Sequence, residues 1–203
     1  MGLTVYMEGG GNNKSSKNKL RIGMTEFLVV LKDELIKKGS NLKIVACGPR
    51  NKAYKLFVSF KPDSKYSIAI LLVDSEEQVN GKPPFEYLKR RDRWEKLNEK
   101  DKVHLMVRTM ETWLISDPQA LEKYYGHNFH RKSLSNHQNL EEVSKETIYK
   151  SLTKATENTS KGEYHKIDHA SELLKVIDSG KVRERCPHCD LLFTDLLTEI
   201  NKL

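Results

Sequence analysis

The chain has 203 residues, of which 37% are hydrophobic and 31% are charged, and it carries a formal net charge of +7. No run of 18 apolar residues occurs, which argues against a membrane span, and the apolar stretch at 3–7 is too short for a signal peptide. Three cysteines, an odd number, argue against a disulfide framework and lead us to expect a reducing, cytoplasmic compartment.

In chain order, the first half of the sequence alternates between strand and helix patterns. Met24, Leu28 and Leu31 share one face of an expected helix, and the run at 68–73 is wholly apolar, as in parallel strands covered on both sides. The alternation predicts a parallel sheet of about four strands with right-handed crossovers. The expected strands are 3–7, 42–47, 68–73 and 103–107, and the expected helices are 20–38, 51–60 and 84–97.

The second half of the sequence has helical patterns. Asp117 followed by Pro118 predicts a helix start, and Gly126 predicts its end. Further helices are expected at 145–156, 171–177 and 190–203, with a polar loop at 158–169. We therefore expect an α/β domain over residues 1–126 and a helical extension over residues 127–203 that packs on it.

The positive charge is concentrated near the start of the chain. Residues 1–60 hold eleven Lys and Arg against four acids, while the remainder is neutral. A basic half suggests a polyanionic partner, with nucleic acid first among the candidates. A solubilising surface is an equally good explanation of charge alone.

Two acidic signatures follow predicted strands. Glu8 comes directly after the first strand, and Asp74 and Glu76 come after the third. Ligand sites of open parallel sheets lie beyond the carboxyl ends of the strands, where strand order reverses, so three carboxylates are expected in one crevice. Oxygen ligands of this kind suit Mg²⁺ or Mn²⁺. Either signature alone is also typical of an ordinary turn or helix start.

A glycine triplet, Gly9, Gly10 and Gly11, follows the first acid. Glycines let the backbone approach a phosphate closely, with N–H groups directed at it. The triplet is followed by no Gly-Lys-Ser/Thr and is not part of a GxGxxG pattern, so it matches neither a Walker loop nor a dinucleotide fingerprint.

The combination of a Glu-Gly after the first strand with an Asp-x-Glu after the third resembles the Toprim pattern of topoisomerases, primases and overcoming-lysogenization-defect (OLD) nucleases. The wider string is similar to a bacterial family of stand-alone Toprim-like proteins. The matching pieces are 8–11, 45–48, 72–76, 90–92, 106–113 and 161–164. The resemblance implies a Toprim-like (Rossmann-like) fold, a magnesium-dependent nuclease, an ABC- or AAA-type ATPase partner and a role in phage defence. A homodimer is a further expectation.

The resemblance also implies roles for individual residues. Glu8 corresponds to the Toprim glutamate, a metal ligand and general acid/base, and Asp74 to the first acid of the metal motif. Glu76 stands where many Toprim proteins have aspartate, and Glu77 replaces the usual following glycine. Glu111 corresponds to the later acid that holds a second metal in OLD-type nucleases, and we favour this role over the alternative of a helix-surface glutamate beside a buried Trp113. Lys161 corresponds to their lysine near the scissile phosphate.

Other basic residues are weaker candidates for phosphate binding. Lys166 lies in the same polar loop as Lys161, and Arg90 and Arg91 lie on a predicted helix. A solvated loop and an exposed helix face are the alternatives.

Cys186 and Cys189 form a CxxC pair near the carboxyl end of the sequence. A thioredoxin-type motif follows an early strand, and one pair is too few for a structural zinc site. His188 or a second copy of the chain could complete a zinc site, so a redox or zinc role stays open as the less favoured alternative.

The expected function is metal-dependent cleavage of DNA or RNA phosphodiester bonds. Two alternatives stay open. One is a non-catalytic regulatory or toxin-like subunit that binds an ATPase and nucleic acid. The other is a phosphatase or nucleotidyl-transfer enzyme that uses the same metal site on a small substrate.

Overall fold

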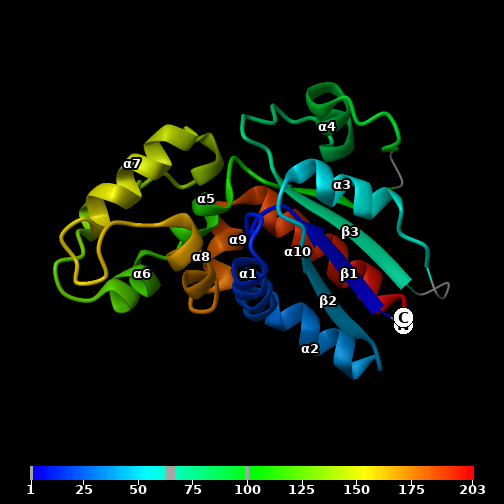
Figure 1. Ribbon diagram of the computed structural model, residues 1–203, viewed down its shortest axis with the longest axis horizontal. Coiled ribbons are helices and arrows are strands. Elements are labelled where there is room, and N and C mark those ends of the chain that lie inside the picture. Colours follow the sequence, from blue (N-terminus) through cyan, green and yellow to red (C-terminus); the bar gives the residue numbers. More distant parts are fainter. Residues whose placement is uncertain (1, 63–66, 99–100) are drawn as a thin grey trace.

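A computed structural model describes residues 2–62, 67–98 and 101–203. It contains a four-stranded parallel sheet in the order β2-β1-β3-β4, which confirms the predicted α/β class (Figure 1). The strands are β1 (Gly2–Met7), β2 (Asn41–Ala46), β3 (Ser67–Asp74) and β4 (Val103–Met106). Strand order reverses between β1 and β3, so the crevice expected at a switch point lies between these two strands.

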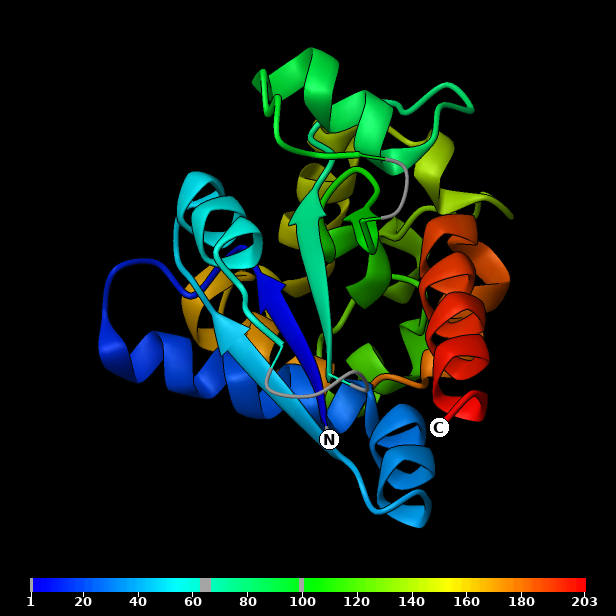
Figure 2. The same cartoon turned by 90° about the vertical axis from the view of Figure 1, so that its right-hand side faces the viewer.

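Helices cover both faces of the sheet (Figures 1 and 2). One face carries α3 (Arg50–Val58) and α4 (Pro84–Asp92), and the other carries α1 (Lys14–Phe27), α2 (Val29–Lys37) and α10 (Pro187–Asn201). Neighbouring residues of β3 serve opposite cores: Leu72 packs in the core below α1, whereas Leu71 packs in the core below α3. This burial on both faces explains the unbroken apolar run of β3.

The remaining helices belong to the carboxyl-terminal half. They are α5 (Met110–Leu114), α6 (Pro118–Tyr125), α7 (Lys145–Thr156), α8 (Lys166–Leu174) and α9 (Ser179–Arg185), with short 3₁₀ turns η1 (Arg131–Ser133) and η2 (Leu140–Glu142). In Figure 1, α6, α7 and α8 lie beyond the carboxyl ends of the strands. No helix in the described part of the chain is both long and apolar enough to cross a membrane.

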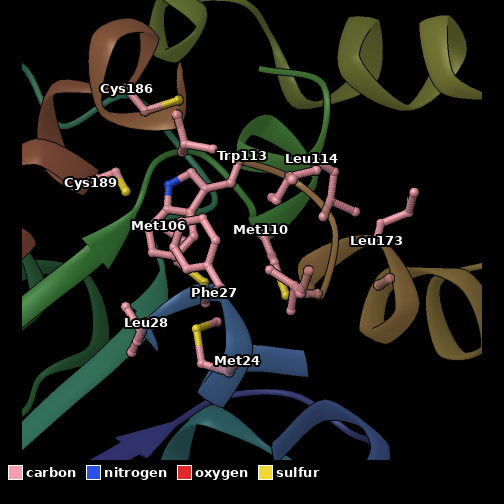
Figure 3. Close-up of a cluster of buried hydrophobic side chains, with 14 of the residues drawn as sticks. Met24, Phe27, Leu28, Met106, Met110, Trp113, Leu114, Leu173, Cys186 and Cys189 are labelled. Atoms are coloured by element: carbon pink, nitrogen blue, oxygen red, sulfur yellow. The ribbon is translucent and has the colours of Figure 1, made fainter. Parts of the chain in front are cut away.

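One apolar core joins the sheet to the later helices. Phe27 of α1 stacks on Trp113 of α5 with ring centroids 5.2 Å apart (Figure 3), and Phe193 of α10 makes an edge-on contact with Phe27. Cys186 and Cys189 lie beside Trp113 in the same core. The chain segments on the two sides of residue 126 therefore share one interior.

The expected helix at 20–38 is wrong in its bounds. The helical segment begins earlier, at Lys14, because the side chain of Asn13 caps it by accepting from the N–H of Ser15 at 2.7 Å. It is divided in two at Leu28, whose ψ of 21° departs from helical geometry.

Two other expected helices differ in their bounds, and one helix was not expected. The one at 84–97 ends at Asp92, because Arg93 adopts a left-handed φ of +57°. The one at 171–177 begins at Lys166, inside the predicted polar loop. The helix α9, which Asp178 caps, was not predicted.

Candidate functional site

Glu8 and Asp74 lie side by side at the carboxyl ends of two neighbouring parallel strands. Met7 and Leu72 are register partners, and the N–H of Glu8 donates to the carbonyl of Leu72 at 3.0 Å. The N–H of Asp74 in turn donates to a carboxylate oxygen of Glu8 at 3.3 Å. The two acids, 66 residues apart in sequence, therefore meet as the strand pattern predicted.

The glycine triplet, which we call the glycine loop, turns the chain from β1 into α1. Gly9 forms two backbone hydrogen bonds of 2.9 Å with Gly48, which fasten the loop beside β2. Gly10 has a φ of +79°, and a Cβ atom there would lie 2.9 Å from the Cα of Lys17. Only glycine fits such a close approach in a left-handed conformation. The loop therefore packs directly on the first turn of α1.

A pocket of about 390 Å³ opens between these elements. Part of its lining comes from the glycine loop, the carboxylates and the lysine of α8. Apolar residues of α1, α5 and α8 and of the end of β4 also line it. The polar lining includes Glu8, Asp74, Glu76 and Lys166, and we call the apolar residues Leu20, Met106, Met110, Ile167 and Ala170 the apolar wall.

Asp74 is almost fully enclosed, with 5% of its surface exposed. One carboxylate oxygen accepts from the N–H of Met110 at 2.9 Å, and the other lies 3.7 Å from the ammonium of Lys166. Burial raises the pKa of Asp74 to about 7, against the opposing effect of Lys166, and the nearby carboxylates of Glu111 and Glu8 raise it further. A positive charge in the pocket would favour the ionised form.

Glu111 is fully buried, so the interpretation as a surface glutamate is wrong. It accepts hydrogen bonds from the hydroxyls of Thr109 and Tyr164, the latter at 2.9 Å, and it lies 3.4 Å from the ammonium of Lys166. Burial alone would raise the pKa of Glu111, but Lys166 and these hydroxyl donors hold the pKa below its usual value. Glu111 is therefore a buried carboxylate that anchors Lys166.

Glu8 is held by an arginine. A guanidinium nitrogen of Arg50 lies 3.8 Å from the Glu8 carboxylate and donates to the carbonyl of Asp74 at 3.2 Å. The other nitrogen donates to Asp92 at 2.8 Å, and the group lies over the ring of Trp94. Burial raises the pKa of Glu8, and the charge of Arg50 opposes this effect. Arg50 thus ties the tips of β1 and β3 to the end of α4.

Glu76 faces the same pocket from a strained turn. Its φ is +67°, and its N–H donates to the carbonyl of Arg108 at 2.7 Å. Its carboxylate forms an ion pair with Lys145, the first residue of α7. The α7 helix, far along the sequence, therefore reaches the acidic end of β3.

The donor chemistry of Glu8, Asp74 and Glu76, which we call the acidic triad, fits a hard divalent cation, because all three offer carboxylate oxygens to one pocket. Each member has a cationic partner nearby, which is Arg50, Lys166 or Lys145. Within residues 2–62, 67–98 and 101–203, no three acidic, His or Cys side chains are grouped closely enough to hold a metal. Binding of a divalent ion thus requires side chains of the triad to rearrange.

The structure does not bring three of the predicted residues to the pocket. Lys161 lies over the ring of Tyr124, 4.7 Å from its centroid, so its expected position near the reacting phosphate is wrong. Arg90 and Arg91 line a separate pocket beside the loop that follows β3, and Arg91 pairs with Asp92. Lys166, the weaker lysine candidate in the sequence, is the one that faces the acids, because α8 begins at this residue.

Sequence reasoning missed Arg50, Lys145 and Tyr164. Arg50 follows β2 at the same edge of the sheet as the acids, so the rule that located Glu8 would also have found it. Lys145 and Tyr164 carry no comparable signal, because tertiary packing alone brings them to the acids.

The two cysteines of the CxxC pair are free and fully buried. Burial raises the pKa of Cys186 to about 12, and the pKa of Cys189 is also raised by burial. Both side chains therefore stay protonated thiols in an apolar core, and a reactive thiolate is not favoured.

A family model described as a domain of unknown function, DUF4276, matches residues 7–197. This range includes every residue of the candidate site. No curated protein and no solved structure matches the chain.

Proposed function

The chain belongs to the DUF4276 family, and from its site we propose that it is a divalent-metal-dependent phosphodiesterase of the Toprim type that cleaves nucleic acid. The observation that carries the proposal is the convergence of Glu8 and Asp74 at adjacent strand ends, facing one pocket together with Glu76 and Lys166. Carboxylates that share a pocket with a lysine suit a metal ion and a phosphate group.

The acidic triad would hold Mg²⁺ or Mn²⁺. When bound, such an ion supplies Lewis-acid polarisation of a phosphoryl oxygen. Lys166 faces the same space and neutralises negative charge that develops on the phosphoryl group. The N–H of Gly9 is already bonded to the carbonyl of Gly48, but Gly10 and Gly11 of the glycine loop also line the pocket, next to the start of α1, where backbone N–H groups suit a phosphate.

Glu111 acts as a positioning residue for Lys166 rather than as a ligand of a second ion. Both of its oxygens already accept hydroxyl hydrogen bonds, and its side chain is closed to solvent. A second metal would need to displace Thr109, Tyr164 and Lys166 together.

The decisive experiment incubates the purified chain with single-stranded and duplex DNA and with RNA, with Mg²⁺ or Mn²⁺ and then with EDTA. Cleavage should require the metal and should be abolished in Glu8→Gln and Asp74→Asn. Glu146→Gln is the matched control, because Glu146 pairs with Lys150 on the exposed side of α7. Full activity in both site variants would refute the assignment. Metal-independent binding without cleavage would support a non-catalytic subunit instead.

A small phosphate ester is the second candidate substrate. The pocket volume of about 390 Å³ lies near the lower end of the range for small-molecule sites, roughly 300–1,000 Å³. A phosphatase or nucleotidyl-transfer enzyme would turn over a mononucleotide ester and leave polymers intact, which the same assay distinguishes.

The cellular setting follows from the same proposal. All three cysteines are free thiols, which suits a reducing cytoplasm. The ATPase partner and the phage-defence role stay predictions from the resemblance, and co-purification with a candidate ATPase is the measurement that tests them.

A further inference from the structure

The pocket has a second half that metal and phosphate chemistry does not use. Its apolar wall combines nearly buried side chains (Leu20, Met106, Met110 and Ala170 are at most 5% exposed) with Ile167, which is 49% exposed. The buried members form the deep part of the pocket, and Ile167 lies at its rim. A site for phosphate alone has no need of such a surface.

The apolar wall is joined directly to the charged groups on two elements. Met110 lines the pocket with its side chain while its N–H binds Asp74 at 2.9 Å. Ile167 lines the pocket and immediately follows Lys166, whose ammonium lies 3.7 Å from Asp74. An apolar group held by this wall would thus sit next to a phosphate held by the acids and Lys166.

The depth of the pocket depends on how α1 and α8 cross. Gly23 of α1 packs so closely on α8 that a Cβ atom there would lie 2.3 Å from the carbonyl oxygen of Ser171. The residues of these two helices that line the pocket are Ser16 and Leu20 on α1 and Ile167, Ala170 and Ser171 on α8. Because Ser171 both lines the pocket and makes the contact with Gly23, the tight crossing bounds the space between the two helices.

We propose that the apolar wall binds the base of an unpaired nucleotide whose phosphate lies at the acidic triad. This inference rests on the proposed function. A nucleobase is a flat group with apolar faces, it is attached one sugar away from a phosphate, and it stacks on apolar side chains. Bases inside a duplex are covered by their neighbours and cannot reach such a wall without leaving the stack. The substrate class is accordingly a single strand, a frayed end or a mononucleotide.

The test compares two ligands that differ only in the base. AMP and ribose 5-phosphate are titrated calorimetrically into the full chain with Mg²⁺, and AMP is expected to bind about tenfold more tightly because of base stacking. Single-stranded oligonucleotide should compete with AMP, whereas a blunt duplex of the same sequence should not.

Two variants locate the effect. Ala170→Leu fills the deep part of the pocket and should bring the AMP affinity down to that of ribose 5-phosphate. Ile167→Ala should weaken AMP about threefold and leave ribose 5-phosphate unchanged. Because the Ile167 side chain is half exposed, its truncation should leave the fold intact. Ile167→Ala therefore tests the base site even if Ala170→Leu does not fold. Val176→Ala removes an equally exposed aliphatic side chain outside the pocket and should change neither affinity.

Equal affinities for AMP and ribose 5-phosphate, or no detectable AMP binding, would overturn the base site. So would an AMP preference that Ile167→Ala leaves intact, or a duplex that competes as well as a single strand. Each of these results is compatible with metal-dependent cleavage that needs Glu8 and Asp74, so the failure of the base site and the failure of the proposed function are separate outcomes.

Discussion

The ammonium nitrogen of Lys166 lies 3.4 Å from a carboxylate oxygen of Glu111, which is fully buried. The same nitrogen is 3.7 Å from Asp74, so one lysine serves both a structural acid and a candidate metal ligand. Burial opposes the charged form of Lys166, but the carboxylates of Asp74 and Glu111 outweigh it and raise the pKa of Lys166, which in turn helps to hold the pKa of Glu111 below its usual value. Lys166 therefore stays protonated and keeps its ammonium group at the pocket.

The first prediction concerns this charge. Lys166→Met should lower kcat of metal-dependent cleavage by about a hundredfold, the usual effect of removing one group that stabilises transition-state charge. Glu111→Gln should lower kcat by less, about tenfold, because Lys166 remains but is held less firmly in position. The double variant should be no worse than Lys166→Met alone, since Glu111 acts through Lys166. Additive losses in the double variant would contradict the positioning role.

The second prediction concerns Arg50, whose side chain is 16% exposed and pairs with Asp92, itself 12% exposed. Arg50→Met should lower the free energy of unfolding by about 2 kcal/mol, because it removes charged hydrogen bonds to Asp92 and to the Asp74 carbonyl, while Arg91 still pairs with Asp92. It should also weaken Mn²⁺ binding by releasing Glu8. Urea unfolding and metal titration measure the two effects.

Charge alone should not rescue the Arg50 variant. Arg50→Lys keeps the positive charge but cannot contact Glu8, the Asp74 carbonyl and Asp92 together, so less than half of the lost stability should return. Arg21→Met is the matched control, because the Arg21 side chain donates to Asn18 on an exposed face of α1. Full recovery with lysine would show that the fork geometry of Arg50 is unimportant.

The third prediction separates backbone strain from close packing in the glycine loop. Gly10 and Gly39 both have positive φ, but a Cβ atom at Gly39 meets open space, whereas one at Gly10 meets the backbone of Lys17. Gly39→Ala should therefore destabilise the chain by about 1 kcal/mol through conformation alone. Gly10→Ala should destabilise it more and should also weaken AMP binding. Equal unfolding free energies for the two variants would argue against a packed loop.

The sheet and the positions of its acids follow from local patterns. The apolar run before Asp74 and the glycine loop after Glu8 are both contiguous in sequence, and the rule for strand ends joins them. The cationic partners are not predictable in this way. Lys145 and Lys166 begin helices whose placement depends on the shared core around Trp113, and no periodicity near either lysine indicates that it turns toward an acid.

The helix bounds show the same division between local and tertiary causes. The end of α4 depends on the left-handed turn at Arg93, which lies next to the Arg50–Asp92 contact. The start of α8 at Lys166 replaces a predicted loop, and the ammonium of this first residue donates to the buried carboxylate of Glu111 at 3.5 Å. Sequence periodicity locates a helix, but such contacts decide where it begins and ends.

The last prediction concerns His104 on β4, which is 2% exposed and has no hydrogen-bond partner for either ring nitrogen among the described residues. Burial lowers the pKa of His104 to about 4, with Lys102 and His188 adding to the effect, and the nearest acid, Asp195 of α10, is 3.9 Å away. The unfolded chain binds a proton at this position below about pH 6.5, whereas the folded chain does so only below about pH 4.

Between these two values the unfolded state holds more protons, so stability must fall as the pH is lowered from 6.5 to 4, by roughly 3 kcal/mol from His104 alone. His104→Leu should remove this part of the acid sensitivity, because it leaves an apolar side chain in an apolar place. Urea unfolding at pH 7.5, 6 and 5 measures how the free energy of unfolding changes with acid. The control is His127→Gln, at an exposed position. A leucine variant that loses stability with acid as steeply as the parent would show that the sensitivity does not come from His104.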